Sequence, residues 1–336
     1  MKAIVIEKPG EVSVKEVPRP KPGPGEVIIK VKTCGVCATD YHIFLGEFPA
    51  NYPLIPGHEI SGEIIELGDE VKELKIGSKV AVDPSIYCGS CYFCKTNRGN
   101  HCYDFKALGV TQNGGFAEYM AAPQENVYPV PENLSFEEAS FVEPVSCVVY
   151  GLKRLQIQPG SNVLIFGAGP IGLQLAQLAK YGNAAKVSVT DINPKNLETA
   201  EEVGIKNTFL VYNDSEEIIK DLDPMGYDVV IDATGIAEVA SRSFKYIRET
   251  GKIMFFGVCS PEEKIEVSPY EIYKNDLEIY GSFALCYNFY QAINILENKV
   301  IKVKPLISDY LGFDDLVSIL RDRRSRKGSL KAMLKL

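Results

Sequence analysis

Hydrophobic and polar positions alternate with a period of two in short runs over residues 1–147. Such runs occur in "EVIIKVK" (26–32), "EISGEIIELG" (59–68) and "KVAVD" (79–83), and turn residues such as Pro56-Gly57 separate them. Alternation bounded by proline and glycine is typical of strands with one buried face. The pattern therefore predicts an irregular β-rich domain with long loops.

From about residue 148 the pattern changes to apolar runs separated by helix-like segments. "NVLIF" (162–166) is followed by a helical pattern from Pro170 to Tyr181, and the next apolar run is "KVSVTD" (186–191). Further strand-like runs occur at residues 208–211, 227–234, 251–257 and 277–283. Strands that alternate with helices form parallel, doubly wound sheets. We therefore expect an α/β protein in which residues 148–282 form a Rossmann domain.

Length, composition and charge fit a globular protein of two domains. The chain has 336 residues, of which 46% are hydrophobic and 24% are charged, and single cores rarely grow to this length. A formal net charge of −8 argues against a nucleic-acid partner, because phosphates require a basic face. The densest positive run, at residues 321–331, is expected to be a solvated helix end and loop.

The N-terminal residues 1–17 alternate like a strand and lack the apolar core of a signal peptide. No apolar run approaches the ~18–20 residues that span a bilayer. We therefore expect a cytoplasmic protein without a membrane partner. In a reducing compartment the nine cysteines, an odd number, are better explained as metal ligands or reactive thiols than as disulfides.

A glycine triplet, Gly167-x-Gly169-x-x-Gly172, directly follows a predicted strand and opens a predicted helix. In that context Gly167 allows a tight turn, Gly169 allows a pyrophosphate to approach the backbone, and Gly172 allows close packing of helix and strand. Phosphates at such a helix N-terminus meet free N–H groups and the positive end of the helix dipole. The motif predicts a dinucleotide site.

Asp191 ends the next strand, nineteen residues past Gly172. A carboxylate at this place can accept hydrogen bonds from both ribose hydroxyls and repels a 2′-phosphate, which favours NAD over NADP. Two alternatives stay open. The glycines could merely tighten a βα turn, and Asp191 could be the N-cap of the helix that begins in "DINPKN".

Four cysteines lie within sixteen positions, at Cys88, Cys91, Cys94 and Cys102. Four thiolates at this spacing can surround one tetrahedral Zn²⁺ and leave no open position, which makes the site structural. An iron–sulfur cluster also uses four cysteines, and the spacing alone does not exclude it. A redox dithiol needs only two thiols and is less well supported.

A second set of candidate ligands lies elsewhere. "TCGVCATDYHI" contains Cys37, "PGHEISGE" contains the adjacent His58 and Glu59, and "ASFVEPVSC" contains Glu143. Each of these histidine and glutamate residues alone would usually be structural, but Cys, His and Glu together match a catalytic zinc with one open position. Beside a nicotinamide, such an ion would bind an alcohol oxygen and lower its pKa.

Taken together, these motifs resemble the zinc-dependent medium-chain alcohol and polyol dehydrogenases over essentially the whole chain. Besides the glycine and cysteine motifs, the resemblance rests on "GVCATDYH", "GHEISGEIIELG", "GGFAEY" (114–119), "FVEPVSC", "IDATG" and "VKPLIS". It implies a GroES-like catalytic domain formed by residues 1–147 and completed by residues 283–336, together with the Rossmann NAD-binding domain at 148–282.

The resemblance also implies a catalytic zinc at Cys37, His58 and Glu59, with Glu143 as a further ligand or as the partner of a zinc-bound water. The four-cysteine lobe would hold a second, structural zinc. An acidic residue, Asp40, would orient the histidine ligand.

Two further residues match a proton relay in that family. The proton would pass from the substrate hydroxyl to Thr39, through the cofactor ribose, and out to His42. The cofactor contacts that the resemblance implies are Gly167, Gly169, Pro170, Ile171, Gly172, Asp191, Phe256, Gly257, Val258, Ser282, Phe283 and Lys331.

Within the family, the Glu-Pro of "FVEPVS" and the "VKPLIS" ending look most like polyol dehydrogenases for sorbitol, arabinitol, galactitol phosphate and inositol. Animal-type sorbitol dehydrogenases have an aromatic residue where this chain has Ile43, and an Arg-aromatic pair where it has Ala284 and Leu285. The expected reaction is therefore NAD-dependent oxidation of a secondary hydroxyl on a sugar alcohol or cyclic polyol. Threonine or a simple secondary alcohol is an alternative substrate, and a non-enzymatic NAD(H) sensor is an alternative of another class. Family members are commonly homotetramers or homodimers.

Overall fold

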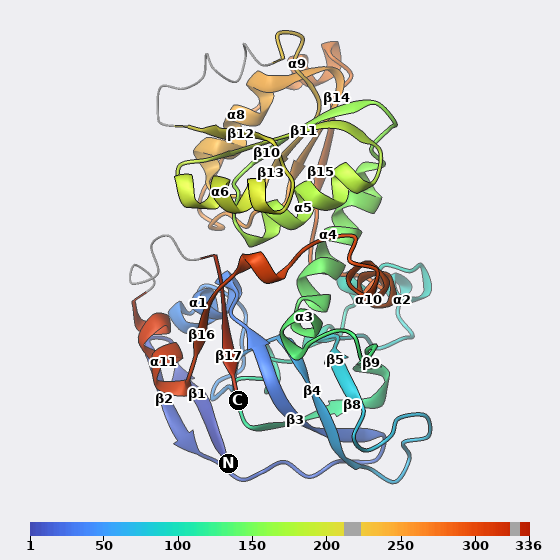
Figure 1. Ribbon diagram of the computed structural model, residues 1–336, viewed down its shortest axis with the longest axis vertical. Helices are drawn as coiled ribbons and strands as arrows, with labels where there is room; N and C mark the ends of the chain where they lie inside the picture. Colours follow the sequence, from blue (N-terminus) through green and yellow to red (C-terminus); the bar gives the residue numbers. More distant parts are fainter. Residues whose placement is uncertain (212–222, 323–329) are drawn as a thin grey trace. The chain divides into compact units, whose positions relative to one another are not determined.

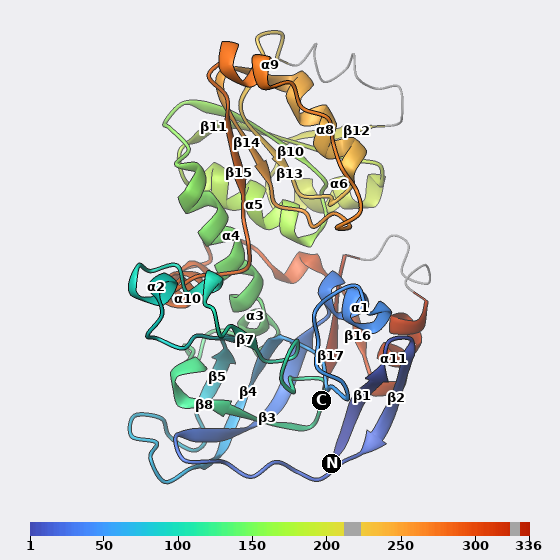
Figure 2. The same ribbon diagram turned by 180° about the vertical axis from the view of Figure 1, so that it is seen from behind.

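The computed structural model describes residues 1–211, 223–322 and 330–336, and within it the chain divides into two compact units (Figures 1 and 2). The first unit comprises Met1–Ser146, Leu285–Lys299 and Ile307–Leu336, and the second comprises Cys147–Ala284 and Val300–Leu306.

The segment Val300–Leu306 was expected in the domain that residues 283–336 complete, but it groups with the second unit. Two hydrogen bonds between Gln177 and Lys302 explain this difference. The side chain of Gln177, on helix α5 (Pro170–Tyr181), donates to the carbonyl oxygen of Lys302 at 3.1 Å and accepts from its N–H at 2.7 Å.

A seven-stranded sheet forms the first unit. Its order is β16-β17-β3-β4-β5-β9, with β8 paired to β3 as well. The bounds are β3 Glu26–Gly35, β4 Glu59–Leu67, β5 Lys79–Val82, β8 Tyr119–Pro123, β9 Val127–Pro129, β16 Ile307–Leu311 and β17 Lys331–Lys335. Two smaller antiparallel pairs are β1 (Lys2–Lys8) with β2 (Glu11–Glu16) and β6 (Ser85–Ile86) with β7 (Lys106–Ala107). The helices of this unit are α1 Ala38–Leu45, α2 Tyr92–Lys95, α3 Phe136–Ser140, α10 Phe289–Glu297 and α11 Phe313–Arg321, while α4 (Val142–Leu155) crosses into the second unit.

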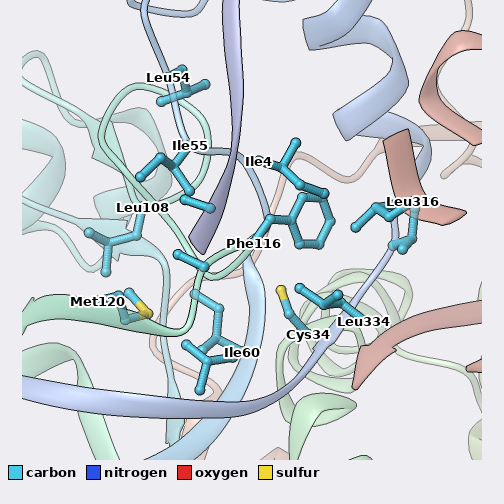
Figure 3. Packing of buried hydrophobic residues seen from close by; sticks show 14 of the residues in the cluster. Ile4, Cys34, Leu54, Ile55, Ile60, Leu108, Phe116, Met120, Leu316 and Leu334 are labelled. Atoms are coloured by element: carbon cyan, nitrogen blue, oxygen red, sulfur yellow. The ribbon is translucent and has the colours of Figure 1, made fainter. Parts of the chain in front are cut away.

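The core of the first unit lies beside strand β3 and supports the segment that carries His58. Phe116 is fully buried among Ile4, Cys34, Ile60 and other apolar side chains (Figure 3). A Cβ on Gly57 would lie 2.5 Å from the Phe116 ring, and Gly57 has a φ of +93° that favours glycine. The ring therefore packs directly against the residue that precedes His58.

The second unit is built on a six-stranded sheet in the order β12-β11-β10-β13-β14-β15, and every neighbouring pair is parallel. The strands are β10 Ser161–Phe166, β11 Ala184–Asp191, β12 Asn207–Leu210, β13 Tyr227–Asp232, β14 Ile247–Phe255 and β15 Glu278–Gly281. Helices α5, α6 (Pro194–Glu202), α8 (Ala237–Tyr246) and α9 (Pro269–Lys274) lie between strands along the chain. This is the 3-2-1-4-5-6 order of a dinucleotide-binding sheet, and the predicted doubly wound architecture is confirmed.

Part of one predicted segment lies outside the described residues. Residues 323–329 belong to the basic run that was expected to be a helix end and loop. Helix α11 ends at Arg321, at the start of that run. No helix in the described part of the chain is long and apolar enough to cross a membrane.

Candidate functional site

Strand register brings the candidate zinc ligands of the first unit together. Gly35, at the end of β3, is opposite Met333 of β17 on one side and Glu59 of β4 on the other. The chain leaves β3 at Gly35 and begins helix α1 three residues later, with Cys37 as the N-cap. Ligand atoms of Cys37, His58 and Glu59 lie within 4.8 Å of one another as a result.

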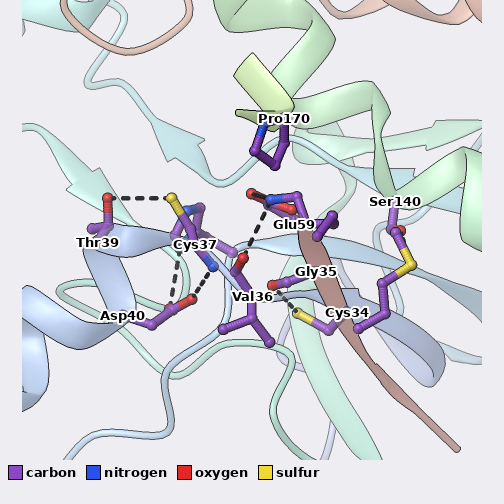
Figure 4. A network of polar contacts seen from close by, with 12 residues as sticks. Cys34, Gly35, Val36, Cys37, Thr39, Asp40, Glu59, Ser140 and Pro170 are labelled. Atoms are coloured by element: carbon purple, nitrogen blue, oxygen red, sulfur yellow. Dashed lines mark hydrogen bonds and ion pairs between the residues drawn. The ribbon is translucent and has the colours of Figure 1, made fainter. Parts of the chain in front are cut away.

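Asp40 holds two of these residues in place from within the core (Figure 4). One carboxylate oxygen accepts the N–H of Cys37 at 2.8 Å, and the other lies 3.4 Å from Nδ1 of His58 and 3.3 Å from the N–H of Gly57. With Asp40 on the Nδ1 side, the Nε2 atom of His58 is left for a metal ion. Asp40 therefore lies where a carboxylate that orients the imidazole is expected.

The carboxylate of Glu59 lies directly over the backbone of Gly35. A Cβ at Gly35 would be 1.9 Å from Oε2 of Glu59, so only glycine leaves room for it. The other oxygen, Oε1, accepts from Nζ of Lys331 at 2.6 Å, and that ammonium also donates to the carbonyl oxygen of Val36 at 3.3 Å. Glu59 and Lys331 are 2% and 5% exposed, which makes this a buried ion pair.

The polar atoms of this site fit a divalent cation. Oε2 of Glu59 is buried and has no hydrogen-bond partner among the described residues. Burial alone would lower the pKa of His58, but the negative charges of Asp40 and Cys37 outweigh it and raise that pKa well above its usual value. A cation would satisfy the orphaned oxygen and offset the same negative charge, and thiolate, imidazole and carboxylate are ligands that Zn²⁺ accepts.

The remaining predicted residues lie at different distances from this group. Oγ1 of Thr39 is 3.6 Å from Sγ of Cys37, whereas His42 is on the last turn of α1 and is bonded to Glu47 at 2.7 Å. Glu143, at the start of α4, is 9% exposed and falls outside the group of mutually close ligand atoms. Its negative charge nevertheless contributes to the raised pKa of Lys331.

Sequence reasoning missed a buried acid at the end of β5. Burial raises the pKa of Asp83 to about 7; the hydrogen bond from the N–H of Ser85 opposes this shift, and repulsion by Glu143 adds to it. The available signal was an aspartate that closes the apolar run "KVAVD". The charges of Asp83 and Glu143 therefore interact.

The four-cysteine lobe has the geometry of a site for one tetrahedral ion. The Sγ atoms of Cys91 and Cys94 are 3.5 Å apart, and the pairs Cys88–Cys94 and Cys91–Cys102 are each 3.9 Å apart. Zn–S bonds of about 2.3 Å predict sulfur–sulfur distances of ~3.8 Å around a tetrahedral ion. These separations leave no room for the several iron and sulfide atoms of an iron–sulfur cluster.

Backbone N–H groups and neighbouring sulfurs shift the pKa values of the cysteines in this lobe. N–H groups of Ser90 and Cys91 lower the pKa of Cys88 to about 6, whereas burial and neighbouring sulfurs raise the pKa of Cys94 to about 12. Four thiolates this close together repel one another, so a cation between them would stabilise the group.

The lobe also holds the segment that follows residue 284 in the chain. The Tyr87 hydroxyl donates to the carbonyl oxygen of Leu285 at 3.2 Å, and Sγ of Cys286 lies 3.6 Å from the carbonyl oxygen of Asn97. The rings of Tyr87 and Tyr287 pack edge to face at 5.1 Å. The lobe is therefore positioned to support the segment through which the chain returns to the first unit.

In the second unit, the glycine triplet has the geometry that a pyrophosphate needs. Gly167 follows β10 and has a φ of +97°. A Cβ on Gly172 would lie 1.9 Å from the carbonyl oxygen of Gly167. A Cβ on Gly169, the N-cap of α5, would meet nothing within 4 Å. The space over this helix N-terminus is therefore open to an anion.

Asp191 is not the N-cap of α6, because that role belongs to Asn193, whose side chain accepts from the N–H of Lys195. The Asp191 carboxylate instead accepts the N–H of Ala168 at 2.7 Å and that of Asn193 at 2.8 Å. It joins the glycine turn to the start of α6, at the carboxyl end of β11.

Exposed apolar side chains gather at the same edge of this sheet, where a planar ring would bind. Val258 follows β14 and is 71% exposed, and Phe283 follows β15 and is 48% exposed. The sequence predicted these two, together with Phe256, Gly257 and Ser282. It missed the exposed Ile192, which directly follows Asp191 at the end of β11, and the exposed Ile236, which follows the loop after Asp232 at the end of β13.

Comparison with known proteins identifies the family of this chain. The profile of the alcohol dehydrogenase GroES-like domain matches residues 23–132, and that of the zinc-binding dehydrogenase domain matches residues 170–298. The chain belongs to the zinc-binding medium-chain dehydrogenase family. The predicted family, its two-part fold and its class as an oxidoreductase are thereby confirmed.

Individual members of the dehydrogenase family match over nearly full length. D-arabinitol dehydrogenase 1 from Uromyces fabae is 36% identical, with 100% of this chain and 97% of that protein aligned. D-altritol 5-dehydrogenase from Agrobacterium fabrum is 34% identical, with 98% of each covered. An L-threonine 3-dehydrogenase from Mesorhizobium japonicum is 33% identical, with 94% of this chain and 93% of that protein aligned.

Among solved structures, a zinc-binding dehydrogenase from Sinorhizobium meliloti 1021 bound to NADP has a TM-score of 0.95 and 32% identity. The match covers 100% of this chain and 99% of that one. An alcohol dehydrogenase from E. coli CFT073 complexed with NADH has a TM-score of 0.93 and 31% identity, with the same coverage.

Proposed function

We propose that this dehydrogenase oxidises a secondary hydroxyl of a sugar alcohol or cyclic polyol with NAD, and catalyses the reverse reduction. The observation that carries the proposal is the Cys37–His58–Glu59 group, whose ligand atoms lie close enough together to hold a metal ion and which has an orphaned carboxylate oxygen. The printed activities of the relatives, on D-arabinitol and D-altritol, favour a polyol.

In this proposal Cys37, His58 and Glu59 hold the zinc, because their ligand atoms lie together, and Glu143 acts beside them as a further acid. When bound there, a zinc ion would supply the Lewis acid that polarises the hydroxyl, and NAD would supply the hydride acceptor. Asp40 keeps the imidazole oriented.

The proton path is the second part of the proposal. Thr39 takes the proton from the substrate hydroxyl, and His42 releases it to solvent. His58 and Glu59 are buried whereas the His42 side chain is 28% exposed, which suits a path that leads outward. The four-cysteine lobe holds the second zinc and has no open position for substrate.

For the cofactor, we propose NAD at the carboxyl edge of the second unit's sheet, on the predicted contacts from Gly167 to Phe283. Lys331, the remaining predicted contact, instead pairs with Glu59 in the first unit. Asp191 supports NAD over NADP, because its carboxylate repels a 2′-phosphate. One structural neighbour was solved with NADP, so the preference is tested directly by comparing kcat/KM for the two cofactors. Equal values would refute the role given to Asp191.

The proposed assembly is a homodimer or homotetramer, and the proposed location is the cytoplasm. Strand β15 lies at the edge of its sheet and Ile279 on it is 40% exposed, which leaves an edge open for pairing in a homodimer or homotetramer. All nine cysteines are free, which suits the reducing cytoplasm. Light scattering on the purified protein tests the assembly.

A substrate panel tests the reaction. NADH formation is followed with D-arabinitol, D-altritol, D-sorbitol, myo-inositol, galactitol 1-phosphate, L-threonine and 2-butanol. We expect the highest kcat/KM with one of the polyols. A higher kcat/KM with L-threonine would show that the substrate is this amino acid and not a polyol. No turnover with any of these compounds would favour an NAD(H) sensor.

A further inference from the structure

The turn that ends helix α1 places Glu47 against the ring of His42. Oε2 of Glu47 lies 2.7 Å from Nδ1 of His42, and the N–H of Glu47 donates to the carbonyl oxygen of His42 at 2.9 Å. The two residues are therefore joined through both backbone and side chain, five positions apart.

Several contacts fix this turn. Gly46 is the C-cap and has a φ of +80°, and a Cβ there would lie 2.8 Å from Cγ of Pro9. The hydroxyl of Tyr52 donates to the carbonyl oxygen of Ile43 at 2.5 Å. These contacts hold the backbone of the turn, which keeps the Glu47 carboxylate within reach of the His42 ring.

Helix capping does not explain an acid at this place. The C-terminal end of a helix carries partial negative charge, so a carboxylate just beyond it is mildly unfavourable. The ion pair itself adds little stability, because the side chains of His42 and Glu47 are 28% and 53% exposed. The hydrogen bond to the imidazole gives Glu47 a different use.

We propose that Glu47 is a positioning residue for the proton relay, which fixes the tautomer and orientation of His42. A carboxylate can only accept, so Nδ1 of His42 carries a hydrogen and Nε2 is left with its lone pair. For each hydroxyl oxidised, one proton arrives at Nε2 and then leaves to water. The Nδ1–H and the Glu47 carboxylate are unchanged, and reduction reverses the path. The inference rests on the relay role proposed for His42.

The test compares Glu47→Gln and Glu47→Asp in the wild-type background and in a His42→Gln background. Glu73→Gln serves as a matched control, because that exposed carboxylate makes no hydrogen bond or ion pair in the described part of the chain. The zinc-loaded enzyme is assayed with NAD and whichever of D-arabinitol, D-altritol and D-sorbitol gives the highest kcat/KM. Rates are measured at several concentrations of imidazole buffer.

We expect Glu47→Gln to lower kcat/KM by about 5- to 20-fold, below the full ~100-fold or more that a positioned acid–base group contributes. Glu47→Asp should recover part of the rate, and external imidazole should partly restore the Gln variant. In the His42→Gln background the same substitution should have no further effect, because the two residues act as one unit.

Separate outcomes overturn the inference and the function on which it rests. If His42→Gln slows the enzyme but Glu47→Gln does not, or if Glu47→Gln costs the same in both backgrounds, the role given to Glu47 is wrong. If His42→Gln itself leaves kcat/KM and its buffer dependence unchanged, the relay is wrong.

Discussion

Replacing Lys331 by Met should destabilise the metal-free protein strongly, and zinc should remove much of that loss. The ammonium lies 2.6 Å from Glu59, and the two side chains are 6% and 2% exposed. Neighbouring negative charge raises the pKa of Lys331 even though burial, the larger single effect, would lower it. The lysine is therefore charged and is the counter-ion of a buried carboxylate.

Breaking a buried pair from one side leaves an uncompensated charge and typically costs about 3–5 kcal/mol. In a domain of this size about 1 kcal/mol lowers the melting temperature by roughly 2–4 °C. The Lys331→Met variant should thus melt about 6–20 °C below the wild type after chelator treatment. With zinc bound at Glu59, the cation replaces the ammonium as counter-charge. The difference in melting temperature between the variant and the wild type should then become smaller.

Thermal unfolding with and without zinc measures both effects. The double variant Lys331→Met/Glu59→Gln is the matched control, because it removes the stranded charge and should recover most of the stability in the metal-free protein. A single variant within about 1 kcal/mol of the wild type without metal would refute the buried-pair account. A double variant no more stable than the single one would refute it as well.

Three further changes have expected outcomes. Gly35→Ala places a Cβ where Oε2 of Glu59 lies, so zinc content should fall from two ions per chain toward one, as elemental analysis would show; two tightly held ions would contradict this geometry. Cys94→Ser should also remove one zinc and should increase hydrogen exchange at residues 285–287, which the lobe supports; unchanged exchange would show that the support comes from elsewhere. As pH falls, the cluster at His58 should release zinc, because the negative charges of Asp40 and Cys37 raise the pKa of His58 and let protons compete with the ion for the imidazole. Equilibrium dialysis of Cys94→Ser, which keeps only the ion at His58, measures this release; zinc affinity that does not change with pH would contradict it.

Motifs that act over a short stretch of chain could be predicted from the sequence alone. The triplet Gly167–Gly172 needs only a strand before it and a helix after it, and the cysteines at 88–102 need only short loops. Both were predicted in their functional sense, and the structure gives each the expected local geometry.

Contacts between distant segments could not be predicted in the same way. Lys331 was expected at a pyrophosphate, yet its ammonium meets Glu59, 272 positions away. That contact depends on the register of β17, β3 and β4, which no local pattern encodes. The burial of Asp83 beside Glu143 and the docking of residues 285–287 on the cysteine lobe depend on tertiary packing for the same reason.

The most direct test of the account is the zinc content and activity of Cys37→Ser. The substitution should leave one zinc per chain, in the lobe, and should preserve NAD binding, as judged by quenching or enhancement of nucleotide fluorescence. Polyol oxidation should fall by at least ~1,000-fold, because the reaction depends on the lost ion. A Cys37→Ser protein that holds one zinc, binds NAD and oxidises polyols at the wild-type rate would contradict the placement of the chemistry at Cys37, His58 and Glu59.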